Sequence, residues 1–551
     1  MNRLSRRAVL RHLIAGGTML AGSALGDAST DMAAPSDTCK AATRIIRTRS
    51  GRLRGRLCSG VAVFRGIPYG GPTDGAGRFL PPPAPAPWSG VRDAFEYGPP
   101  CVQINTDLPA WVDPRPASEN CLFLNVWAPQ GTHGSALPVM VWIHGGAYVS
   151  GSGGLSLYDG ETLARRENVV VVTVNHRLNA FGYLYLGGLS SRYIESGNAG
   201  QRDLVAALEW VRDNIGGFGG NPGNVAVFGE SGGGAKISTL CGMPSAKGLF
   251  HKAIIESGSL WDSYTPYEAT EMTKACLAQL SLSVRDFDRL GHVPAERLAA
   301  AGQAAATQYG DPLAFRPVVD GRSIPEKPWD PHAPDLAAAV PMLIGTNSDE
   351  AAYFVDDPVN EPMNDEELRT RLIKACRRIS LSAAQAGTLI NGYRENERTS
   401  SRLDLLVQIA TDAWMWRNAT TQAERKVEQK ASPVYMYQFT WRTPCFGRQW
   451  APHGVEVPFV FGNLEYRLAW DEADTPAVRA AADPTGIRYR LADTTMAAWA
   501  QFARTGSPST ASLPWPAYDR ERRNTMILGA RCGIESDPGS WRRALLDRVL
   551  G

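Results

Sequence analysis

The sequence predicts an α/β fold in which a large, mostly parallel central sheet is flanked by helices. Two observations carry this prediction. Short apolar runs recur between residues 122 and 344 and are continuous rather than alternating, as is typical of strands covered on both faces. Between two of these runs, residues 203–215 repeat apolar side chains at three- and four-residue spacing, which predicts an amphipathic crossover helix.

The same patterns predict the individual elements in order. Apolar residues alternate with turn residues at 42–55 and 61–69, which is typical of antiparallel edge strands. The continuous runs predict strands at 122–127, 139–143, 169–174, 225–228, 253–255 and 342–344, and a further strand is expected at 434–441. The charged stretch 366–427 has a helical pattern, so we expect a helical insertion at about 360–430, packed over one end of the sheet.

The N-terminus has the pattern of an export signal. Arg6 and Arg7 form a pair that precedes a weakly apolar stretch, and Ala24 and Gly26 supply the small side chains that a signal peptidase needs. We therefore expect residues 1–26 to be a twin-arginine signal peptide, residues 27–551 to form a single domain, and the mature protein to be periplasmic or secreted. The apolar stretch falls short of the ~20 residues of a spanning helix, so stable membrane insertion is not expected.

The overall charge is nearly balanced. The net charge of +2 becomes −2 without residues 1–26, which hold four arginines and no acid. We find no basic stripe with interleaved aromatic residues, and nucleic-acid binding is therefore not predicted.

The chain contains nine cysteines, so at least one is unpaired within it. Cys101 and Cys121 enclose a short polar loop and are the favoured pair in an oxidising compartment. The other seven are expected to be buried small apolar residues. None has metal-ligand spacing, and neither a metal nor a cofactor is predicted.

One motif carries nucleophilic chemistry. Gly229-Glu230-Ser231-Gly232-Gly233 is the one Gly-x-Ser-x-Gly sequence in the chain, and it lies between a predicted strand and a helix-compatible run. This is the context of a nucleophile elbow, in which a tight turn projects the serine hydroxyl at a helix N-terminus. Ser231 is therefore the candidate nucleophile.

A serine nucleophile needs a base, and the base needs a carboxylate to orient it. His453 is the best-placed base among the four histidines that follow Ser231, because it lies on a turn after a predicted strand. The strand at 342–344 leads to both Asp349 and Glu350, and the residues alone do not choose between these acids. The segment His144-Gly145-Gly146-Ala147 also follows a strand and fits the loop that donates amides to an oxyanion.

These features together resemble the type-B carboxylesterase and cholinesterase family, over nearly all of the chain beyond the signal. The resemblance is carried by five ordered motifs: 64–69 (FRGIPY), 118–125 (SENCLFLN), 142–147 (WIHGGA), 218–222 (FGGNP) and 229–231 (GES).

The resemblance implies an α/β-hydrolase fold and a serine carboxylesterase that acts on a small-molecule ester through an acyl-enzyme. It implies a triad of Ser231, Glu350 and His453. Further implied roles are oxyanion amides on Gly146, Ala147 and Gly232, a pocket-lining Glu230, a Ser257 that hydrogen-bonds the triad acid, and a bridge between Cys101 and Cys121.

The sequence departs from the family pattern at two positions in these motifs. Gly232 replaces the usual alanine, which is expected to loosen the elbow, and Ala147 stands where many members have a third glycine, which is expected to narrow the oxyanion loop. Amide or carbamate cleavage by the same residues and a non-catalytic adhesion protein are the alternatives. The substrate depends on loop side chains such as Trp111, Tyr148, Trp261, Phe354 and Trp414, and the oligomeric state is left open.

Overall fold

The computed structural model describes residues 39–104, 112–131, 134–260, 262–309, 315–354, 363–397, 401–445, 448–466 and 475–551. Across these residues a twelve-stranded sheet has the order β1-β4-β5-β7-β9-β8-β10-β11-β12-β13-β16-β17. Its strands are β1 (Cys39–Ala42), β4 (Arg56–Cys58), β5 (Val61–Pro68), β7 (Phe123–Pro129), β8 (Leu137–Ile143), β9 (Val170–Val174), β10 (Gly220–Glu230), β11 (Lys252–Glu256), β12 (Met342–Asn347), β13 (Val434–Phe439), β16 (Asn524–Leu528) and β17 (Gly533–Ser536).

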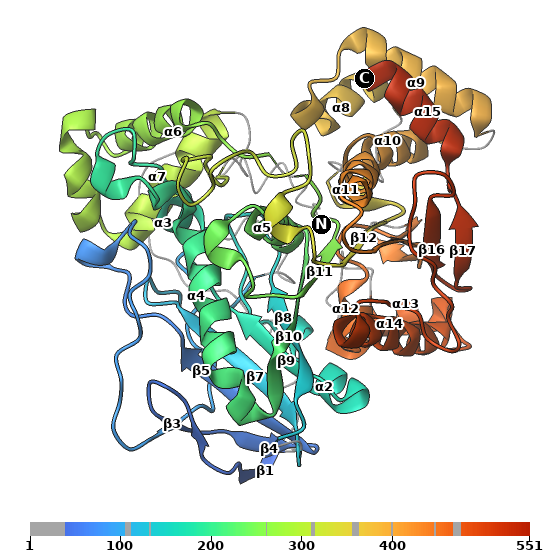
Figure 1. The fold of residues 1–551 in the computed structure, drawn as a ribbon. Helices are drawn as coiled ribbons and strands as arrows, with labels where there is room; N and C mark the ends of the chain where they lie inside the picture. Colours follow the sequence, from blue (N-terminus) through green and yellow to red (C-terminus); the bar gives the residue numbers. More distant parts are fainter. Residues whose placement is uncertain are drawn as a thin grey trace, which may run out of the picture.

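The strands from β9 to β16 are parallel to one another, and antiparallel strands lie at both edges. This confirms the predicted mostly parallel sheet. Helices surround it (Figure 1), namely α2 (Glu161–Glu167), α3 (Asn179–Tyr183), α4 (Ala199–Asn214), α5 (Gly232–Leu240), α6 (Pro266–Gln279), α7 (Ala295–Gln308), α8 (Asp365–Ala375), α9 (Ala383–Asn396), α10 (Arg402–Thr411), α11 (Arg417–Glu428), α12 (Val457–Phe461), α13 (Pro476–Ala482), α14 (Ile487–Thr505) and α15 (Ser540–Leu550).

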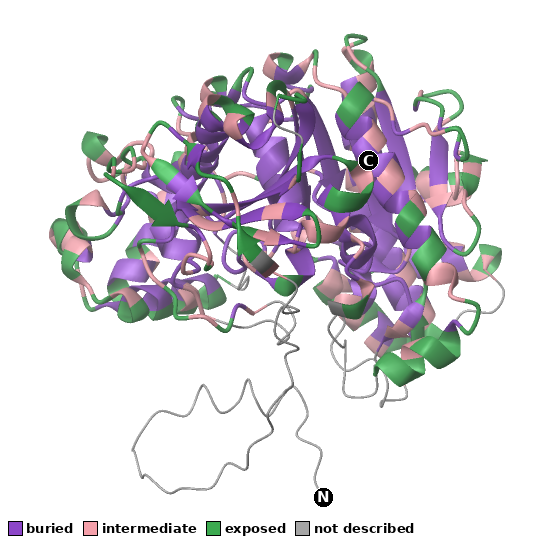
Figure 2. Ribbon diagram, turned by 90° about the horizontal axis from the view of Figure 1, so that it is seen from below, coloured by how far each residue is buried: buried purple, intermediate pink, exposed green. Residues whose placement is uncertain are grey.

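The central strands are apolar on both faces because each face has its own core. Val139, Val141 and Ile143 of β8 belong to one hydrophobic cluster, whereas Met140 and Trp142 of the same strand belong to another. Figure 2 shows the buried sheet between layers of helices that are exposed only on their outer sides. The continuous apolar runs in the sequence therefore have the predicted cause, which is cover on both faces.

The N-terminal strands were expected to form one edge of the large sheet, but they are divided between two sheets. After β1 the chain leaves the large sheet and forms a separate three-stranded sheet of β2 (Ile46–Arg47), β3 (Arg52–Arg54) and β6 (Val91–Asp93). A tight turn joins β2 to β3, because the Thr48 N–H donates to the carbonyl oxygen of Gly51 at 2.8 Å. A second small sheet pairs β14 (Thr443–Cys445) with β15 (Arg448–Trp450).

The expected bridge between Cys101 and Cys121 is not formed. Both residues are buried free thiols, and the Sγ atom of Cys101 accepts a hydrogen bond from the Leu178 N–H at 3.3 Å. A hydrogen bond to Cys101, followed by burial, raises the pKa of the Cys121 thiol. The two side chains are thus in contact without a covalent bond.

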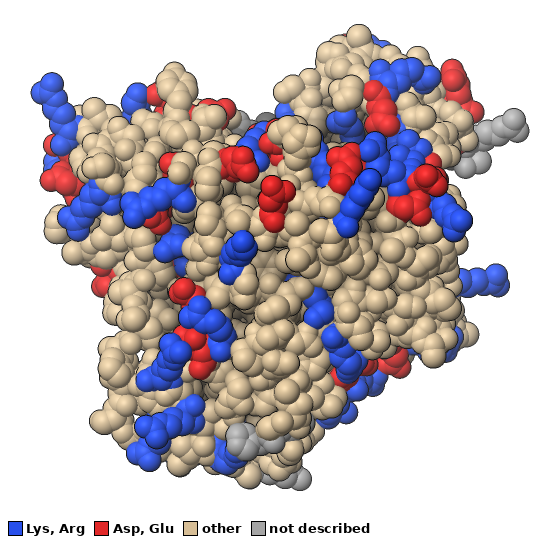
Figure 3. Space-filling model, in the orientation of Figure 1, with Lys and Arg blue, Asp and Glu red and all other residues tan. Residues whose placement is uncertain are grey.

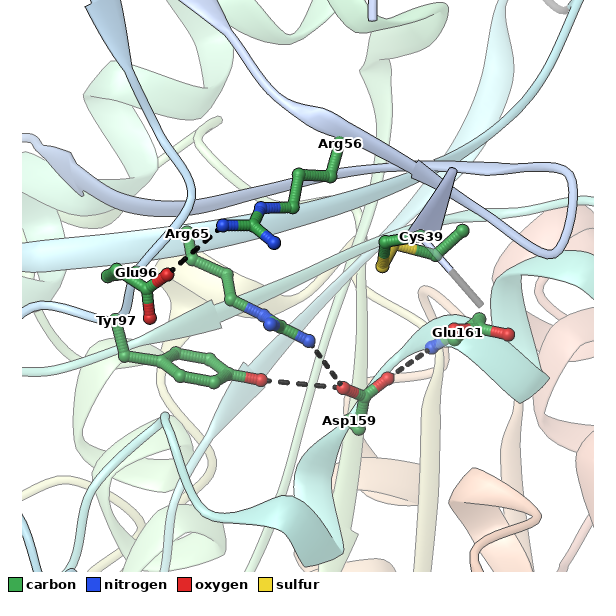
Figure 4. The surroundings of a disulfide bond; sticks show 8 residues. Cys39, Arg56, Arg65, Glu96, Tyr97, Asp159 and Glu161 are labelled. Carbon is green, nitrogen blue, oxygen red and sulfur yellow. Dashed lines mark hydrogen bonds and ion pairs between the residues drawn. A yellow bond between two sulfur atoms is a disulfide. The ribbon is translucent and has the colours of Figure 1, made fainter. Parts of the chain in front are cut away.

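The structure instead joins Cys39 to Cys58, two residues predicted to be buried free thiols (Figure 4). The cause is strand register: β1 pairs antiparallel with β4, and Cys39 lies directly opposite Cys58 with 4.1 Å between the Cα atoms. When two cysteines face each other across neighbouring strands in this way, their Cβ atoms are close enough for the two sulfur atoms to form a bond.

No helix in the described part of the chain is long and apolar enough to cross a membrane.

Candidate active site

Ser231 occupies the sharp turn between β10 and α5. Its backbone has φ 55° and ψ −121°, a strained conformation that is typical of a nucleophile elbow. A Cβ atom on Gly233 would overlap the carbonyl oxygen of Ile143, and one on Gly229 would lie 2.9 Å from the Gly233 backbone. The turn therefore accepts only glycine at these two flanking positions, which explains the motif.

Glu350 and His453 lie against each other beside this turn. The Nδ1 atom of His453 is 2.5 Å from the Oε2 atom of Glu350, and Glu350 is fully buried. The other oxygen of Glu350, Oε1, accepts hydrogen bonds from the Ser257 hydroxyl at 2.5 Å and from the Asn347 N–H at 2.7 Å. These donors fix the orientation of the Glu350 carboxyl group toward the imidazole.

The geometry distinguishes the two acids that the sequence left open. Asp349 points away from the imidazole and anchors the segment before His453: its Oδ2 atom accepts from the Ala451 N–H at 2.9 Å, and its own N–H donates to the Ala451 carbonyl at 3.1 Å. Burial raises the pKa of Asp349. Glu350 contacts the ring itself, in agreement with the choice implied by the resemblance.

The predicted oxyanion loop lies directly against the elbow. Gly146 and Ala147 have φ values of 79° and 51°, so the loop turns sharply after β8. A Cβ atom on Gly232 would overlap the carbonyl oxygen of Ala147 and lie 2.5 Å from its Cα. The residue after Ser231 and the glycine-rich loop are thus in the close contact that a shared oxyanion site requires.

Four buried glutamates surround the imidazole and the elbow: Glu230, Glu256, Glu350 and Glu456. The Nε2 atom of His453 lies 3.1 Å from the Oε1 atom of Glu230. Burial, and then the charges of Glu350 and Glu256, raise the pKa of Glu230. Burial alone raises the pKa of Glu256 to about 8 and is the largest cause of the raised pKa of Glu456. Burial therefore disfavours the ionised form of Glu230, Glu256 and Glu456, and repulsion from neighbouring carboxylates adds to this effect at Glu230 and Glu456.

Lys236 is a buried lysine of this region. Its Nζ atom donates to the His144 carbonyl oxygen at 3.0 Å and lies 5.6 Å from the centre of the Tyr148 ring. Burial lowers the pKa of Lys236 to about 7, and Glu230 opposes that shift. Burial, together with Lys236, lowers the pKa of His144 to about 3. His144 is therefore neutral, and Lys236 holds both ends of the oxyanion loop.

Aromatic side chains border the imidazole on its other side. The ring of Phe354 lies 5.0 Å from His453 and 5.6 Å from Trp414, and Phe354 is 38% exposed. Two of the predicted substrate-contacting residues, Trp111 and Trp261, lie outside the described residues. Among the described residues no cluster of three or more histidine, cysteine, aspartate or glutamate side chains is arranged to hold a metal ion.

Comparison with known proteins decides the family. A profile described as the carboxylesterase family matches residues 42–537. The chain belongs to the carboxylesterase family. It is a carboxylic-ester hydrolase of the α/β-hydrolase fold, as the resemblance implied.

This carboxylesterase is similar to several characterised esterases. It is 39% identical to a para-nitrobenzyl esterase from Bacillus subtilis over 509 residues, which cover 91% of this chain and 98% of the relative. A solved thermophilic para-nitrobenzyl esterase superposes with a TM-score of 0.78 at 38% identity and covers 91% of this chain and 99% of its own. A carboxylesterase from Geobacillus stearothermophilus superposes with a TM-score of 0.78 at 36% identity, with coverage of 92% and 100%.

The structure changes the interpretation of one departure from the family pattern. Gly232 was expected to loosen the elbow through backbone entropy, but the contact with Ala147 shows that a side chain at position 232 has no space. In this carboxylesterase the alanine is at position 147, in the predicted oxyanion loop, and position 232, directly after Ser231, is glycine.

Sequence reasoning assigned no role to Lys236, Asn347 or Glu456 of this carboxylesterase. Asn347 donates from its N–H to Glu350 and from its side chain to Glu456 at 2.5 Å and to the Pro452 carbonyl at 3.1 Å. It therefore ties the acid to the histidine loop. A lysine five residues after the nucleophile, within an apolar helix, was the one local signal that could have drawn attention to Lys236.

Proposed function

We propose that this carboxylesterase works through a Ser231–His453–Glu350 triad and an acyl-enzyme on Ser231. The observation that carries the proposal is the 2.5 Å contact between His453 Nδ1 and Glu350 Oε2, with Nε2 turned toward residue 230, the neighbour of the strained serine. Glu350 fixes the tautomer that leaves Nε2 free to accept a proton.

The chemistry then runs in two halves. His453 Nε2 takes the proton of the Ser231 hydroxyl as Oγ attacks the ester carbonyl carbon, and the amides of Gly146, Ala147 and Gly232 donate to the oxyanion. The imidazolium returns this proton to the departing alkoxide as the C–O bond breaks. A water molecule repeats the sequence on the acyl-enzyme, which releases the carboxylic acid and restores Ser231.

The buried Glu230 supports the same step. When protonated it places no negative charge beside the Ser231 hydroxyl, and its contact with Nε2 holds the ring near the elbow. The family and the relatives named as esterases favour carboxylic esters over amides and over a non-catalytic role. We propose short-chain aryl and benzyl esters as the substrate class, because the relative at 39% identity is named for a para-nitrobenzyl ester.

The test is hydrolysis of a short-chain p-nitrophenyl ester by matched variants. Ser231→Ala and Glu350→Gln are each expected to lower kcat on the order of 10³-fold or more, since each removes a member of the triad. Asp349→Asn is the control for its neighbour, and we expect a loss of about tenfold or less because Asp349 only anchors the loop. Equal losses in Glu350→Gln and Asp349→Asn, with both variants folded by circular dichroism, would remove Glu350 from the triad.

We also propose that residues 1–26 direct export by the twin-arginine route, as the Arg6-Arg7 pair suggests. Replacing both arginines by lysine keeps the charge and is expected to retain active enzyme in the cytoplasmic fraction. Unchanged export of that variant would contradict the assignment.

A further inference from the structure

One short segment near the N-terminus has an excess of basic over acidic residues. Residues 40–73 contain eight lysine and arginine residues and no acid, whereas residues 27–551 as a whole carry a net charge of −2. The remainder of the mature chain therefore carries −10. Carboxylates from other segments pair with four of these cations, Arg49, Arg54, Arg56 and Arg65.

Part of this segment is exposed on the small sheet of β2, β3 and β6. In the small sheet, Arg47 of β2 lies opposite Arg52 of β3, and Arg52 in turn lies opposite Val91 of β6. Arg54 is two residues further along β3 on the same side. We call the outer side of this sheet the arginine face, made of Ile45, Arg47, Arg52, Arg54, Val91 and Asp93, which lies opposite Arg54. All six side chains are exposed.

The arginine face is under-neutralised. Arg54 pairs with Asp93 at 2.6 Å, but in the described part of the chain no carboxylate pairs with Arg47 or Arg52. The Nε atom of Arg52 donates only to the Gly90 carbonyl, at 3.3 Å. Like charges directly opposite each other on neighbouring strands destabilise a sheet, so an anionic partner would relieve this repulsion. Figure 3 shows several lysine and arginine side chains over the lower-left part of the molecule, and others over the upper right, where acidic side chains lie among them.

Apolar groups accompany these cations. Ile45 and Val91 are 49% and 38% exposed, and both are among the few large apolar side chains that the described residues expose to this degree. A cavity of about 350 Å³ lies beside the same region and is lined by Ile46, Leu57, Phe64 and Phe218, with Arg44 also in its wall. Cations mixed with exposed aliphatic side chains are typical of a surface that rests on lipid head groups.

The arginine face lies far from the reacting serine. The Nη2 atom of Arg44 donates to the Gly217 carbonyl at 3.2 Å, and Gly217 belongs to the short helix Ile215–Phe218 that precedes β10. Ser231 directly follows the other end of β10, a strand of eleven residues. Because each residue of a β-strand advances the chain by about 3.3 Å, the two ends of β10 are separated by on the order of 30 Å. In Figure 1 the small sheet is at the lower end of the molecule, and α5 begins well above it.

We propose that the arginine face docks this esterase on an anionic lipid surface. Arg47 and Arg52 contact the lipid phosphates, Ile45 and Val91 enter the head-group layer, and the active-site end of the sheet faces away from the bilayer toward dissolved esters. The proposal does not depend on the identity of the triad, and it needs no membrane-spanning helix.

The test is co-sedimentation of residues 27–551 with vesicles. We expect binding to phosphatidylcholine vesicles that contain one third phosphatidylglycerol, weaker binding at high salt, and little binding to pure phosphatidylcholine. Arg47→Gln/Arg52→Gln should bind about tenfold or more weakly. The control Arg285→Gln/Arg297→Gln removes the same charge from two exposed arginines elsewhere and should bind like the wild type. Hydrolysis of a p-nitrophenyl ester should be unchanged in both, which confirms that they are folded.

A second variant separates lipid from other polyanions. Ile45→Ser/Val91→Ser keeps every charge and should bind the anionic vesicles more weakly, while it binds duplex DNA, used as a second polyanion, no differently from the wild type. Three results would overturn the proposal: equal binding of the wild type to neutral and anionic vesicles, equal loss in the two arginine variants, or full vesicle binding by Ile45→Ser/Val91→Ser.

Discussion

The conformation of single residues determines the geometry around Ser231. The serine and Ala147 both have positive φ values, and each is held there by neighbours that are glycine because no Cβ atom fits. The elbow motif was visible in the sequence because local sterics dictate it. The residues alone did not choose between Asp349 and Glu350, because both follow the same strand. The family resemblance implied Glu350, and of the two acids it is Glu350 that contacts the His453 ring.

The contact between positions 232 and 147 leads to a first prediction. Gly232→Ala places a methyl group against the Ala147 backbone, displaces the oxyanion loop and should lower kcat for a p-nitrophenyl ester by about tenfold or more, with a smaller change in KM. Gly232→Ala/Ala147→Gly should recover much of this loss, because glycine lets the loop backbone move. If the single variant is as active as the wild type, the two positions are not coupled.

The buried Glu256 leads to a prediction on stability. Its pKa rises from an ordinary 4.5 to about 8 in the folded protein, so the folded state holds a proton that the unfolded state has lost between these pH values. This contribution is fully present below about pH 4.5 and is lost as the pH rises through 8. Between pH 5 and pH 9, the Tm of Glu256→Gln should therefore fall less than that of the wild type.

The control for this prediction is Glu296→Gln, a change at an exposed position in the first turn of α7. Its Tm should follow the wild-type curve across the same pH range. Parallel curves for the wild type and Glu256→Gln would show that Glu256 titrates alike in the folded and unfolded states.

At the scale of elements, a buried ion pair connects the crossover helix to the sheet. Arg177, just after β9, contacts both carboxylate oxygens of Asp203 in α4, at 2.6 and 2.8 Å, and both side chains are almost completely buried. The Arg177 N–H also donates to Asp203 at 2.9 Å. The helix starts at Ala199, four residues before the predicted 203, so Asp203 lies within α4 and not at its N-terminus.

Breaking this pair should cost much of the stability of the fold. Asp203→Asn leaves the Arg177 charge buried and uncompensated, so the free energy of unfolding in a denaturant titration should fall by about 3 kcal/mol or more. Arg202→Gln, at the adjacent and partly exposed position that contacts Glu195 at 3.3 Å, should change it by about 0.5 kcal/mol or less. Similar values for the two variants would mean that the buried pair contributes no more than a surface pair.

At the scale of the whole molecule, periodicity predicted the parallel sheet and its crossover helix because those signals are local. Periodicity could not predict features that depend on contacts between residues far apart in the sequence. The Cys39–Cys58 bridge depends on the register of β1 against β4, and the expected Cys101–Cys121 bridge was wrong for this structure. The buried cluster of Glu230, Glu256 and Glu456 gathers residues far apart in the sequence, so no short window contains it.

In the whole molecule, the active site and the arginine face lie at opposite ends of the parallel strands. The proposed triad lies near the carboxyl ends of the parallel strands, which is where sites on such sheets form. The arginine face lies beyond the amino ends. Docking and catalysis can therefore be changed independently, and the variants proposed for each leave the other untouched.

The most direct test of the acyl-enzyme account is to locate the covalent adduct. Residues 27–551 would be treated with a fluorophosphonate, which reacts with activated serines, and the modified peptide would be identified by mass spectrometry. We predict a single adduct on Ser231, formed in step with the loss of esterase activity and absent from Ser231→Ala. An enzyme that hydrolyses esters but carries its adduct on another residue, or none on Ser231 after complete inactivation, would contradict the account.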